Sequence, residues 1–458
     1  MNHAKWTLSN SFAVALIFSL LAGFFLGGAS FSDVWRVDSD SAAVSPDGLT
    51  WASAYRDIQS GVDAAFASGG GEVWVAEGVY TGTADDVLTL QSGVSLYAGF
   101  AGGEASRDER DWKNHIAAID GDKSRRCVLG AENALLDGFT IQHGYSSHSL
   151  FRGGGMNNGY SGSTVENCIF FDNVSFYDGG GMYNLENVIK DVDSLPKIIN
   201  CVFLKNTATF SGGGMCNSYS PASVTNCLFD GNIAIDGGAI YDEESSLELI
   251  NCVILRNRAV HGGGGIYGNC GSVSLLAHNC TIADNKAGYG GGIYVNHNKV
   301  SLTNCILWGD EAGSGPEIYP YNTYSPASVA YSCIENGYAG DGNISSNPML
   351  VGEGVGGSVQ LRSGSPCIDS GTSTNAPEMD ISGNARPQGA GVDMGAYEGG
   401  VSEEDIVRLT IAAAPEEGGY VSPASGTYSY ARGEQVFLSA RPMGMSWSGW
   451  SGSVSSMM

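Results

Sequence analysis

An Asn-Cys pair recurs along the middle of the chain at nearly regular intervals. The cysteines of successive pairs are 33, 26, 25, 28 and 25 residues apart. A second Asn follows each of the first five cysteines after five residues, and a glycine run begins 10 or 11 residues after each. The cysteines are Cys168, Cys201, Cys227, Cys252, Cys280 and Cys305, and the second asparagines are Asn173, Asn206, Asn232, Asn257 and Asn285. A repeat of this length indicates a solenoid in which each unit forms one coil.

Each repeat consists of pieces that have the length of a β-strand. Short runs such as CLF, AIY and LELI are rich in β-branched and aromatic residues. Asn and Gly separate these runs, as turns with positive φ require. No stretch within a unit is long enough for a stable helix. We therefore predict an all-β fold, a parallel β-helix whose stacked coils bury a core that a single coil could not.

Stacking assigns a role to the repeated letters. Equivalent residues of adjacent coils lie about 4.8 Å apart, so the cysteines form an inward column and the asparagines form ladders at turns. Parallel Cβ vectors suit a disulfide poorly, which favours free thiols in this column. Asp137-Gly138 upstream and Ser332-Cys333 downstream take the Asn-Cys position of further coils. Cys333 and Cys367 are the pair best placed for a disulfide bond.

The repeat resembles that of the polymorphic outer membrane proteins. Phe-x-x-Asn recurs at Phe170–Asn173, Phe203–Asn206 and Phe229–Asn232, and Gly-Gly-Ala-Ile follows at Gly237–Ile240. Other copies read GGGM or GGGI, and the likeness covers roughly residues 130–310. It implies a right-handed parallel β-helix of the pectin-lyase-like kind.

The N-terminal third carries an export signal and the start of the solenoid. His3 and Lys5 precede an apolar stretch, and small residues follow it, so residues 1–29 are predicted to be a signal peptide. The mature chain is then exported, to the cell surface, the outer membrane or the medium, and carries no transmembrane segment. Residues 30–125 form an N-terminal cap and the first coils. Helical spacing of apolar residues predicts an amphipathic helix over 52–67 that covers the open sheet edge.

The repeat region spans residues 126–364, and two different segments follow it. Residues 365–400 resemble the end of a choice-of-anchor domain, which closes a β-helix. Asp380, Arg386, Asp393 and Glu398 form its polar core, which we interpret as a folding clamp. Residues 401–458 resemble an incomplete internalin-type bacterial β-repeat, making a small C-terminal β domain.

The charge of the chain restricts its partners. Forty-eight acidic residues against 22 basic ones give a net charge of −26. Such a chain repels nucleic acid and anionic lipid surfaces. No metal site is predicted, and Ca²⁺ near the polar core of residues 365–400 is the one cofactor that the pattern leaves open.

One ionisable column offers weak candidates for catalysis. The residue before each glycine run is Arg152, Asp178, Ser211, Asp236, His261 or Tyr289. Asp178 and Asp236 lie two coils apart, about 9.6 Å, at the edge of the separation used by inverting glycosidases. Asp178, Asp236 and His261 are therefore the catalytic candidates. The alternative is that these residues have no catalytic role, because polar residues are common at solvated turns before glycine.

A column of tyrosines offers candidates for ligand binding. Tyr183, Tyr241, Tyr267 and Tyr294 each follow an apolar residue after the glycine run. If that residue points inward, the tyrosine rings point outward, where they could stack on sugar rings. A tyrosine ladder that only stabilises the sheet is the alternative.

These observations favour a non-catalytic exported β-helix protein, adhesin-like or binding a polysaccharide or cell-surface glycan. A polysaccharide lyase or glycoside hydrolase on the same fold is the second hypothesis. A structural spacer is the third.

Overall fold

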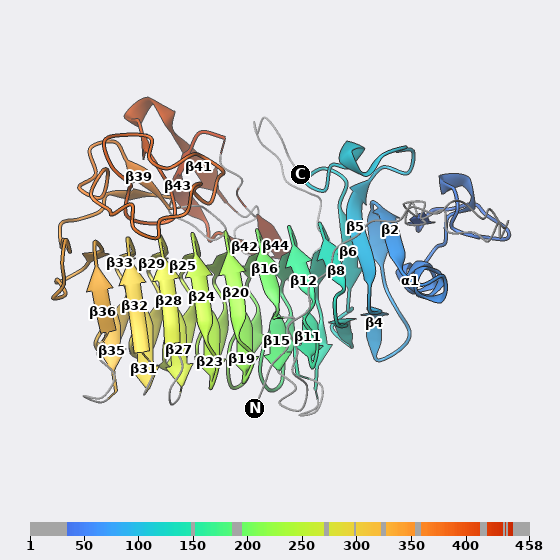
Figure 1. The fold of residues 1–458 in the computed structure, drawn as a ribbon, viewed down its shortest axis with the longest axis horizontal. Coiled ribbons are helices and arrows are strands. Elements are labelled where there is room, and N and C mark those ends of the chain that lie inside the picture. Colours follow the sequence, from blue (N-terminus) through green and yellow to red (C-terminus); the bar gives the residue numbers. More distant parts are fainter. Residues whose placement is uncertain are drawn as a thin grey trace, which may run out of the picture. The chain divides into compact units, whose positions relative to one another are not determined.

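The computed structural model describes residues 34–147, 152–185, 195–269, 274–296, 299–321, 327–352, 359–412, 419–433, 436 and 438–442. The predicted signal peptide and the last part of the predicted C-terminal β-repeat lie outside these residues. The chain winds into about nine stacked coils (Figure 1), whose strands form four parallel sheets of 11, 10, 9 and 7 strands along the stack. The all-β solenoid predicted from the sequence is confirmed.

Sheets A and B receive the strands before and after each Asn-Cys corner. Sheet A contains β1 (Val34–Val37), β2 (Gly71–Ala76), β5 (Val94–Phe100), β8 (Leu135–Asp137), β12 (Thr164–Glu166), β16 (Lys197–Ile199), β20 (Ala222–Thr225), β24 (Leu247–Ile250), β28 (Ser274–His278), β32 (Lys299–Thr303) and β36 (Ala327–Ala330). Sheet B contains β3 (Gly78–Tyr80), β6 (Ala117–Asp120), β9 (Thr140–Gln142), β13 (Ile169–Phe171), β17 (Val202–Leu204), β21 (Leu228–Asp230), β25 (Val253–Leu255), β29 (Thr281–Ala283), β33 (Ile306–Trp308) and β37 (Cys333–Ile334).

Sheets D and C complete each coil, on either side of the glycine run. Sheet D contains β10 (Tyr145–Ser146), β14 (Val174–Ser175), β18 (Thr207–Ala208), β22 (Ile233–Asp236), β26 (Arg258–Gly262), β30 (Lys286–Tyr289) and β34 (Glu311–Ser314). Sheet C contains β4 (Asp86–Thr89), β7 (Arg126–Leu129), β11 (Met156–Gly159), β15 (Met182–Leu185), β19 (Met215–Ser218), β23 (Ile240–Glu243), β27 (Ile266–Asn269), β31 (Ile293–Asn296) and β35 (Ile318–Pro320).

The remaining elements are short. A three-stranded sheet joins β38 (Leu350–Val351), β39 (Gln360–Arg362) and β40 (Gly400–Val401). Two antiparallel pairs follow, β41 (Ile406–Ile411) with β43 (Gly426–Ala431) and β42 (Gly419–Ser422) with β44 (Ser439–Pro442). The helical elements are α1 (Ile58–Ala67) and the 3₁₀ turns η1 (Trp51–Ser53), η2 (Arg107–Glu109) and η3 (Glu403–Asp405).

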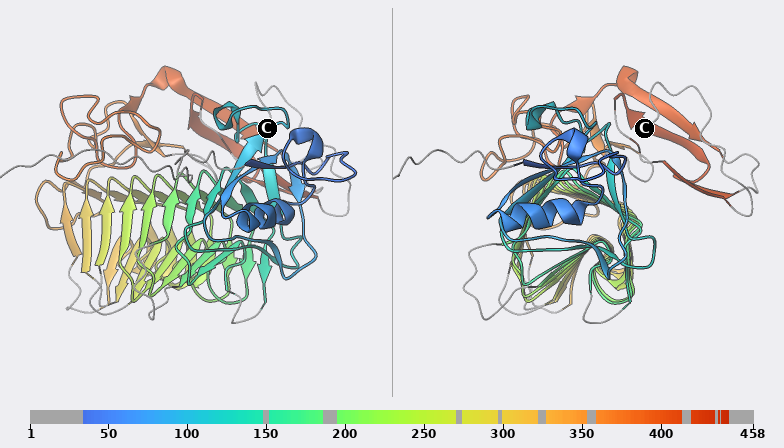
Figure 2. Two further views of the ribbon diagram at one scale, coloured as in Figure 1. Left: turned by 45° about the vertical axis from the view of Figure 1, so that its right-hand side comes forward. Right: turned by 90° about the vertical axis from the view of Figure 1, so that its right-hand side faces the viewer.

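The helix at the N-terminal end is shorter than expected. It begins at Ile58, not near residue 52, because the extended residue Asp57 caps it by accepting the Ser60 N–H at 2.8 Å. Ile58 and Val62 pack into the core, whereas Phe66 is 50% exposed. α1 lies across the N-terminal end of the stack (Figure 2).

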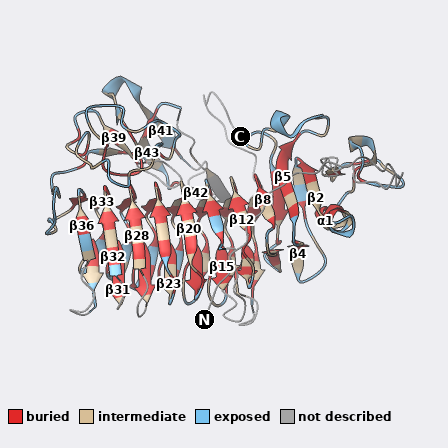
Figure 3. Ribbon diagram, viewed as in Figure 1, coloured by how far each residue is buried: buried red, intermediate tan, exposed pale blue. Residues whose placement is uncertain are grey.

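The interior of the stack is built from columns of like residues (Figure 3). Phe170, Phe203 and Phe229 stack with their ring centroids 4.7 and 4.6 Å apart. The six cysteines of the Asn-Cys pairs are fully buried free thiols, each directed at a carbonyl of the preceding coil. Cys227 Sγ, for example, lies 3.5 Å from the Ile198 oxygen.

The Asn of each Asn-Cys pair is a turn residue on the outside of the corner. Asn226 has φ +55°, and the other five asparagines of the pairs have similar values. Their carboxamides bond from coil to coil, Asn226 Nδ2 donating to Asn200 Oδ1 at 3.1 Å. This outer ladder is therefore partly solvated, since Asn200 is exposed.

The second asparagines form an inner ladder that is completely buried. Asn232 Oδ1 accepts both the backbone N–H and the Nδ2 of Asn206, at 2.9 and 3.0 Å. Asn206 Nδ2 also donates to the Phe170 carbonyl at 2.9 Å. Each amide thus connects three coils at the corner between sheets B and D, and the pattern repeats at Asn173, Asn232, Asn257 and Asn285.

The sequence alignment of coils needs correction by one residue at both ends. Ile306 pairs with Cys333, so Ser332 takes the cysteine position, where its hydroxyl accepts the Cys305 N–H at 3.0 Å. Upstream, Asp137 pairs with Glu166, so Gly138-Phe139 and not Asp137-Gly138 stands opposite Asn167-Cys168. The sequence prediction was displaced by one residue because these two coils have Phe139 and Ser332 at the position that Cys occupies in the other coils.

The shift turns Cys333 outward from sheet B, onto the segment predicted to close the β-helix. Cys333 and Cys367 are both buried in one apolar cluster with Leu361 and Met394, and both are free thiols, not the predicted disulfide. The segment lies along the outer face of sheet B, where its Ala396 packs against Val253, Leu255 and Ala283. It does not simply cover the end of the stack.

Hydrogen bonds to the outer Asn ladder hold this segment in place. Asn304 donates to the Thr372 carbonyl and accepts the Thr372 N–H, both at 2.8 Å. Asn279 Nδ2 donates to the Asp393 carbonyl at 3.1 Å. Inside the segment, Arg386 and Glu398 form an ion pair of 2.6 Å with 1% of each side chain exposed. A buried pair of this kind fixes one conformation of the segment.

The inner ladder ends on an acid. Asp310 takes the Asn position, and its Oδ1 accepts the Asn285 N–H and Nδ2 at 2.7 and 2.9 Å. Asp310 and Glu317 are both buried, and their carboxyl groups interact with each other. Burial raises the pKa of Asp310 to about 7, and burial beside Asp310 raises that of Glu317 as well. The two carboxyl groups therefore retain protons in the folded state above the pH at which ordinary carboxyl groups lose them.

We expect Asn232→Ala to lower the free energy of unfolding by about 3 kcal/mol, because it leaves two Asn206 N–H groups buried without this acceptor and removes one hydrogen bond to the Phe203 carbonyl. Urea denaturation followed by circular dichroism measures the change. The matched control is Asn200→Gly on the exposed outer ladder, which keeps the positive φ and should cost less than about 1 kcal/mol. Equal losses of unfolding free energy in the two variants would show that the inner ladder stabilises the protein no more than the outer one.

We expect Asp310→Asn to stabilise the protein at pH 8 and to change it little at pH 5. A carboxyl with a raised folded pKa contributes stability below its unfolded pKa of about 4, and that contribution is lost as the pH rises through about 7. The amide continues the ladder without a charge. Urea midpoints at both pH values test this, and the same shift at pH 5 as at pH 8 would show that proton binding by Asp310 is not the cause.

Candidate functional site

The outer face of sheet D carries a stripe of exposed apolar side chains. β22 shows the pattern most clearly, since Ile233 and Ile235 point outward on either side of the small buried Ala234. Five consecutive D-strand segments each contribute at least one such side chain. These are Phe176 (49% exposed), Phe210 (45%), Ile233 (45%), Ile235 (37%), Val260 (69%) and Tyr289 (42%), which we call the D stripe.

Aromatic contacts order one end of the D stripe. Tyr177 stacks on Phe210 with ring centroids 5.7 Å apart and lies edge-on to Phe176 at 5.4 Å. These three rings come from two adjacent coils, because sheet D pairs β14 with β18. No other segment that the structure describes covers these rings, and an exposed apolar patch of this kind is a candidate binding surface.

The ionisable column predicted from the sequence runs beside the D stripe, and its charged members form two separate pairs, Arg152 with Asp178 and Asp236 with His261. Asp178 Oδ2 pairs with Arg152 Nη1 at 3.1 Å, and its Oδ1 accepts the Ser211 N–H at 3.1 Å. Burial raises the pKa of Asp178, while Arg152 and Ser211 act in the opposite direction. Arg152 also donates to the Tyr183 hydroxyl at 2.9 Å. Asp178 is therefore held in an ion pair with Arg152, separate from the pair that Asp236 and His261 form.

Asp236 and His261 do meet. His261 Nδ1 lies 2.7 Å from Asp236 Oδ1, which also accepts the Gly262 N–H at 3.1 Å, and 51% of the His261 side chain is exposed. The predicted register was nevertheless wrong. Gly262, not His261, pairs with Asp236, because the positive-φ glycine of this coil is Gly263. His261 is an additional residue in β26, and its ring reaches back one coil to the carboxylate.

The tyrosine column forms a ladder whose ring faces are turned to one another. Tyr241 and Tyr267 stack at 5.1 Å, and Tyr267 and Tyr294 stack at 4.4 Å. Tyr183, Tyr267 and Tyr294 are only 4%, 8% and 3% exposed. Burial raises the pKa of the Tyr183 hydroxyl to about 12. Tyr183, Tyr267 and Tyr294 therefore do not offer open ring faces to a sugar, contrary to expectation, whereas Tyr241 is half-buried with one face stacked on Tyr267.

The sequence reasoning missed the D stripe. The signal was present, because an outward apolar residue follows the inner Asn by three or four positions in each coil, with a small residue (Ser175, Ala208, Ala234, Ala259 or Ala287) between them. Exposure could not be read from this pattern. The outward residues of sheet B are equally apolar, and the segment of residues 359–396 covers them.

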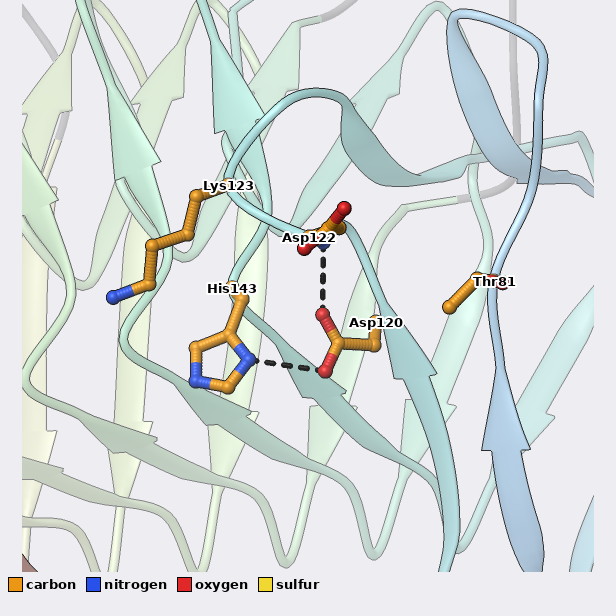
Figure 4. A pocket seen from close by; sticks show the side chains of 5 residues that line it. All are labelled: Thr81, Asp120, Asp122, Lys123 and His143. Atoms are coloured by element: carbon orange, nitrogen blue, oxygen red, sulfur yellow. Dashed lines mark hydrogen bonds and ion pairs between the residues drawn. The ribbon is translucent and has the colours of Figure 1, made fainter. Parts of the chain in front are cut away.

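A hollow lies at the corner between sheets B and D near the first coils. A cavity of about 380 Å³ is lined by Thr81, Asp120, Asp122, Lys123 and His143 (Figure 4). The Asp120 carboxylate accepts the Asp122 N–H, the Gln142 amide and His143 Nδ1 at 2.8, 2.8 and 3.0 Å. Burial alone would raise the pKa of Asp120, but these three hydrogen bonds lower it below its usual value.

The polar groups of this hollow satisfy one another. Lys123 Nζ bonds Asp172 Oδ2 at 2.9 Å, and His143 Nε2 lies 3.9 Å from the same oxygen. Along this corner the carboxylates of Asp120 and Asp172 thus alternate with the His143 ring and the Lys123 ammonium group, which accounts for these residues without a ligand. Within the described ranges, no group of three His, Cys, Asp or Glu side chains is arranged to hold a metal ion. No helix in the same ranges is long and apolar enough to cross a membrane.

Comparisons with known proteins support the fold. A family model described as a right handed beta helix region matches residues 187–325. A solved structure titled "Crystal structure of pectate lyase Pel9A" aligns with 80% of this chain and 96% of its own, at 16% identity and a TM-score of 0.40. No curated protein matches the chain. The solenoid is thus a right-handed β-helix, while its resemblance to the polymorphic outer membrane repeat stays a prediction.

We expect truncation to destabilise the protein much more in the buried tyrosine ladder than on the exposed D stripe. Tyr267→Ala should lower the free energy of unfolding by about 3 kcal/mol, because it opens a cavity between two stacked rings. Tyr289→Ala, on the stripe, should change it by less than about 1 kcal/mol. Chemical denaturation of the two variants provides the comparison, and a neutral Tyr267→Ala would show that this ring is not packed as described.

Proposed function

We propose that the protein is a non-catalytic glycan-binding β-helix protein, acting outside the cell, and that the D stripe is its binding face. The observation that carries the proposal is the unbroken row of exposed aromatic and aliphatic side chains over five coils. Pyranose rings present apolar faces with hydroxyl groups at the edges, which match apolar side chains flanked by polar ones. Arg258, Lys286 and Thr209 are exposed beside the stripe and can bond hydroxyl groups.

The size of the D stripe favours a chain-like ligand over a protein partner. A stable protein interface uses roughly 20 to 30 residues a side. The D stripe has six apolar side chains in a row that follows the stacking direction of the coils. At the strand spacing of about 4.8 Å its five coils span about 19 Å. An extended polysaccharide lying along the stack fits such a narrow, long surface.

A catalytic role is the second candidate, and the Asp236–His261 pair is the observation that favours it. An exposed imidazole held by a carboxylate is a common general base. A glycosidase also needs a second carboxyl group across the bond that is cleaved. Asp178, the predicted partner, is engaged by Arg152 and the Ser211 N–H. The geometry therefore supports binding better than hydrolysis.

We expect the double variant Phe176→Ala, Phe210→Ala to reduce glycan affinity by about tenfold or more, since stacked aromatic rings dominate such contacts. Affinity electrophoresis in gels that contain single polysaccharides measures the effect. Phe66→Ala is the matched control, because Phe66 is equally exposed on α1, away from sheet D. The structural-spacer hypothesis predicts that the unaltered protein binds no glycan at all.

The bound polysaccharides should remain intact after prolonged incubation with the protein. Reducing ends and absorbance from unsaturated products are measured against a buffer blank. Release of either product, lost in His261→Ala, would replace the binding proposal by the catalytic one.

A further inference from the structure

The D stripe lies on a charge-balanced face of a strongly acidic chain. On the D strands and beside the glycine runs, Asp178, Asp236 and Glu311 stand against Arg152, Arg258 and Lys286. At the corner with sheet B, Asp172 and Asp284 stand against Lys205 and Arg256. The whole chain, in contrast, has 48 acids against 22 bases. The face is therefore neutral, while the field of the remaining molecule is negative.

The charges of this face are also engaged with one another. Arg152 pairs with Asp178 at 3.1 Å, Lys286 pairs with Glu311, and Asp236 is bonded by His261. For Arg258 no ion pair is found among the described residues, and its side chain is exposed. A single unpaired cation is far from the row of bases that an anionic polymer requires, whereas guanidinium N–H groups can donate to neutral hydroxyl groups.

We propose that the ligand of the D stripe is an uncharged polysaccharide, bound along the coil-stacking direction; this inference rests on the proposed glycan-binding function. A polyuronate would bring one negative charge per residue toward a chain of net charge −26, and among the described residues of the D strands only Arg258 is an exposed base without an ion pair to offset it. A neutral chain meets no such repulsion. Its sugar faces contact one outward apolar side chain per coil, and its hydroxyl groups contact the polar side chains beside them.

The test compares neutral and acidic polysaccharides at low ionic strength, where charge effects are strongest. Affinity electrophoresis is run with mixed-linkage β-glucan, xyloglucan and galactomannan as neutral probes and with polygalacturonate and alginate as acidic ones. We expect at least one neutral probe to retard the protein with an apparent Kd about tenfold or more below that for either acidic probe. The aromatic double variant should lose that retardation.

The outcomes separate the two proposals. Retardation by an acidic probe alone would overturn the neutral-ligand inference and leave glycan binding standing. Retardation by none of the five probes would overturn both. Binding that survives in the Phe176→Ala, Phe210→Ala variant would place the ligand elsewhere and overturn the assignment to the D stripe.

A charge variant tests the physical reason. Asp178→Asn keeps an acceptor for the Ser211 N–H, and Glu311→Gln is exposed, so the double variant should fold. It leaves Arg152 and Lys286 without their acids and makes the face positive by two charges. We expect it to gain retardation by polygalacturonate that added 0.5 M NaCl removes, because salt screens exposed charges. No gain would show that the charge balance of the face does not exclude polyuronates.

Discussion

The buried asparagine ladder at the corner between sheets B and D is the interaction on which the coil stack depends. The Asn232 carboxamide, for example, accepts two hydrogen bonds from the preceding coil, donates one to a carbonyl of that coil and donates another to the carboxamide of the following coil, all without access to water. A residue lacking either the donor or the acceptor leaves buried groups of adjacent coils unsatisfied. This requirement fixes the register of one coil on the next, and the columns of Cys, Phe and Tyr follow from that register.

The same ladder explains the chemistry at its end. Asp310 supplies the acceptor that Asn285 needs, but its second oxygen replaces an amide donor. Asp310 stands next to a glycine in the same way as the ladder asparagines do. A Cβ on Gly155 would lie 3.0 Å from Asn173 Nδ2, and a Cβ on Gly292 would lie 2.6 Å from Asp310 Oδ2. The stability of the coil that contains Asp310 therefore depends on pH, whereas that of the coils with Asn at this position does not.

The covering of one outer face leaves another as the functional candidate. The outer asparagine ladder binds the segment of residues 359–398, which buries the outward apolar side chains of sheet B. No described segment does the same for sheet D, so its apolar side chains stay exposed. A face that is apolar, narrow, neutral and uncovered suits an extended neutral glycan better than an acidic polymer or a broad protein surface.

The sequence by itself determined the repeat, the strand-sized pieces, the Asn and Gly turns and the inward Cys and Asn columns, because these follow from a local period. It could not place coils whose column residue differs, which is why Gly138, Ser332 and His261 were each assigned one residue away from their structural positions. It also left open which outward side chains meet solvent. Tertiary structure decided this, because a tyrosine is covered by its ladder neighbours and sheet B by a segment about 100 residues distant, whereas no described segment covers Phe176 and Phe210.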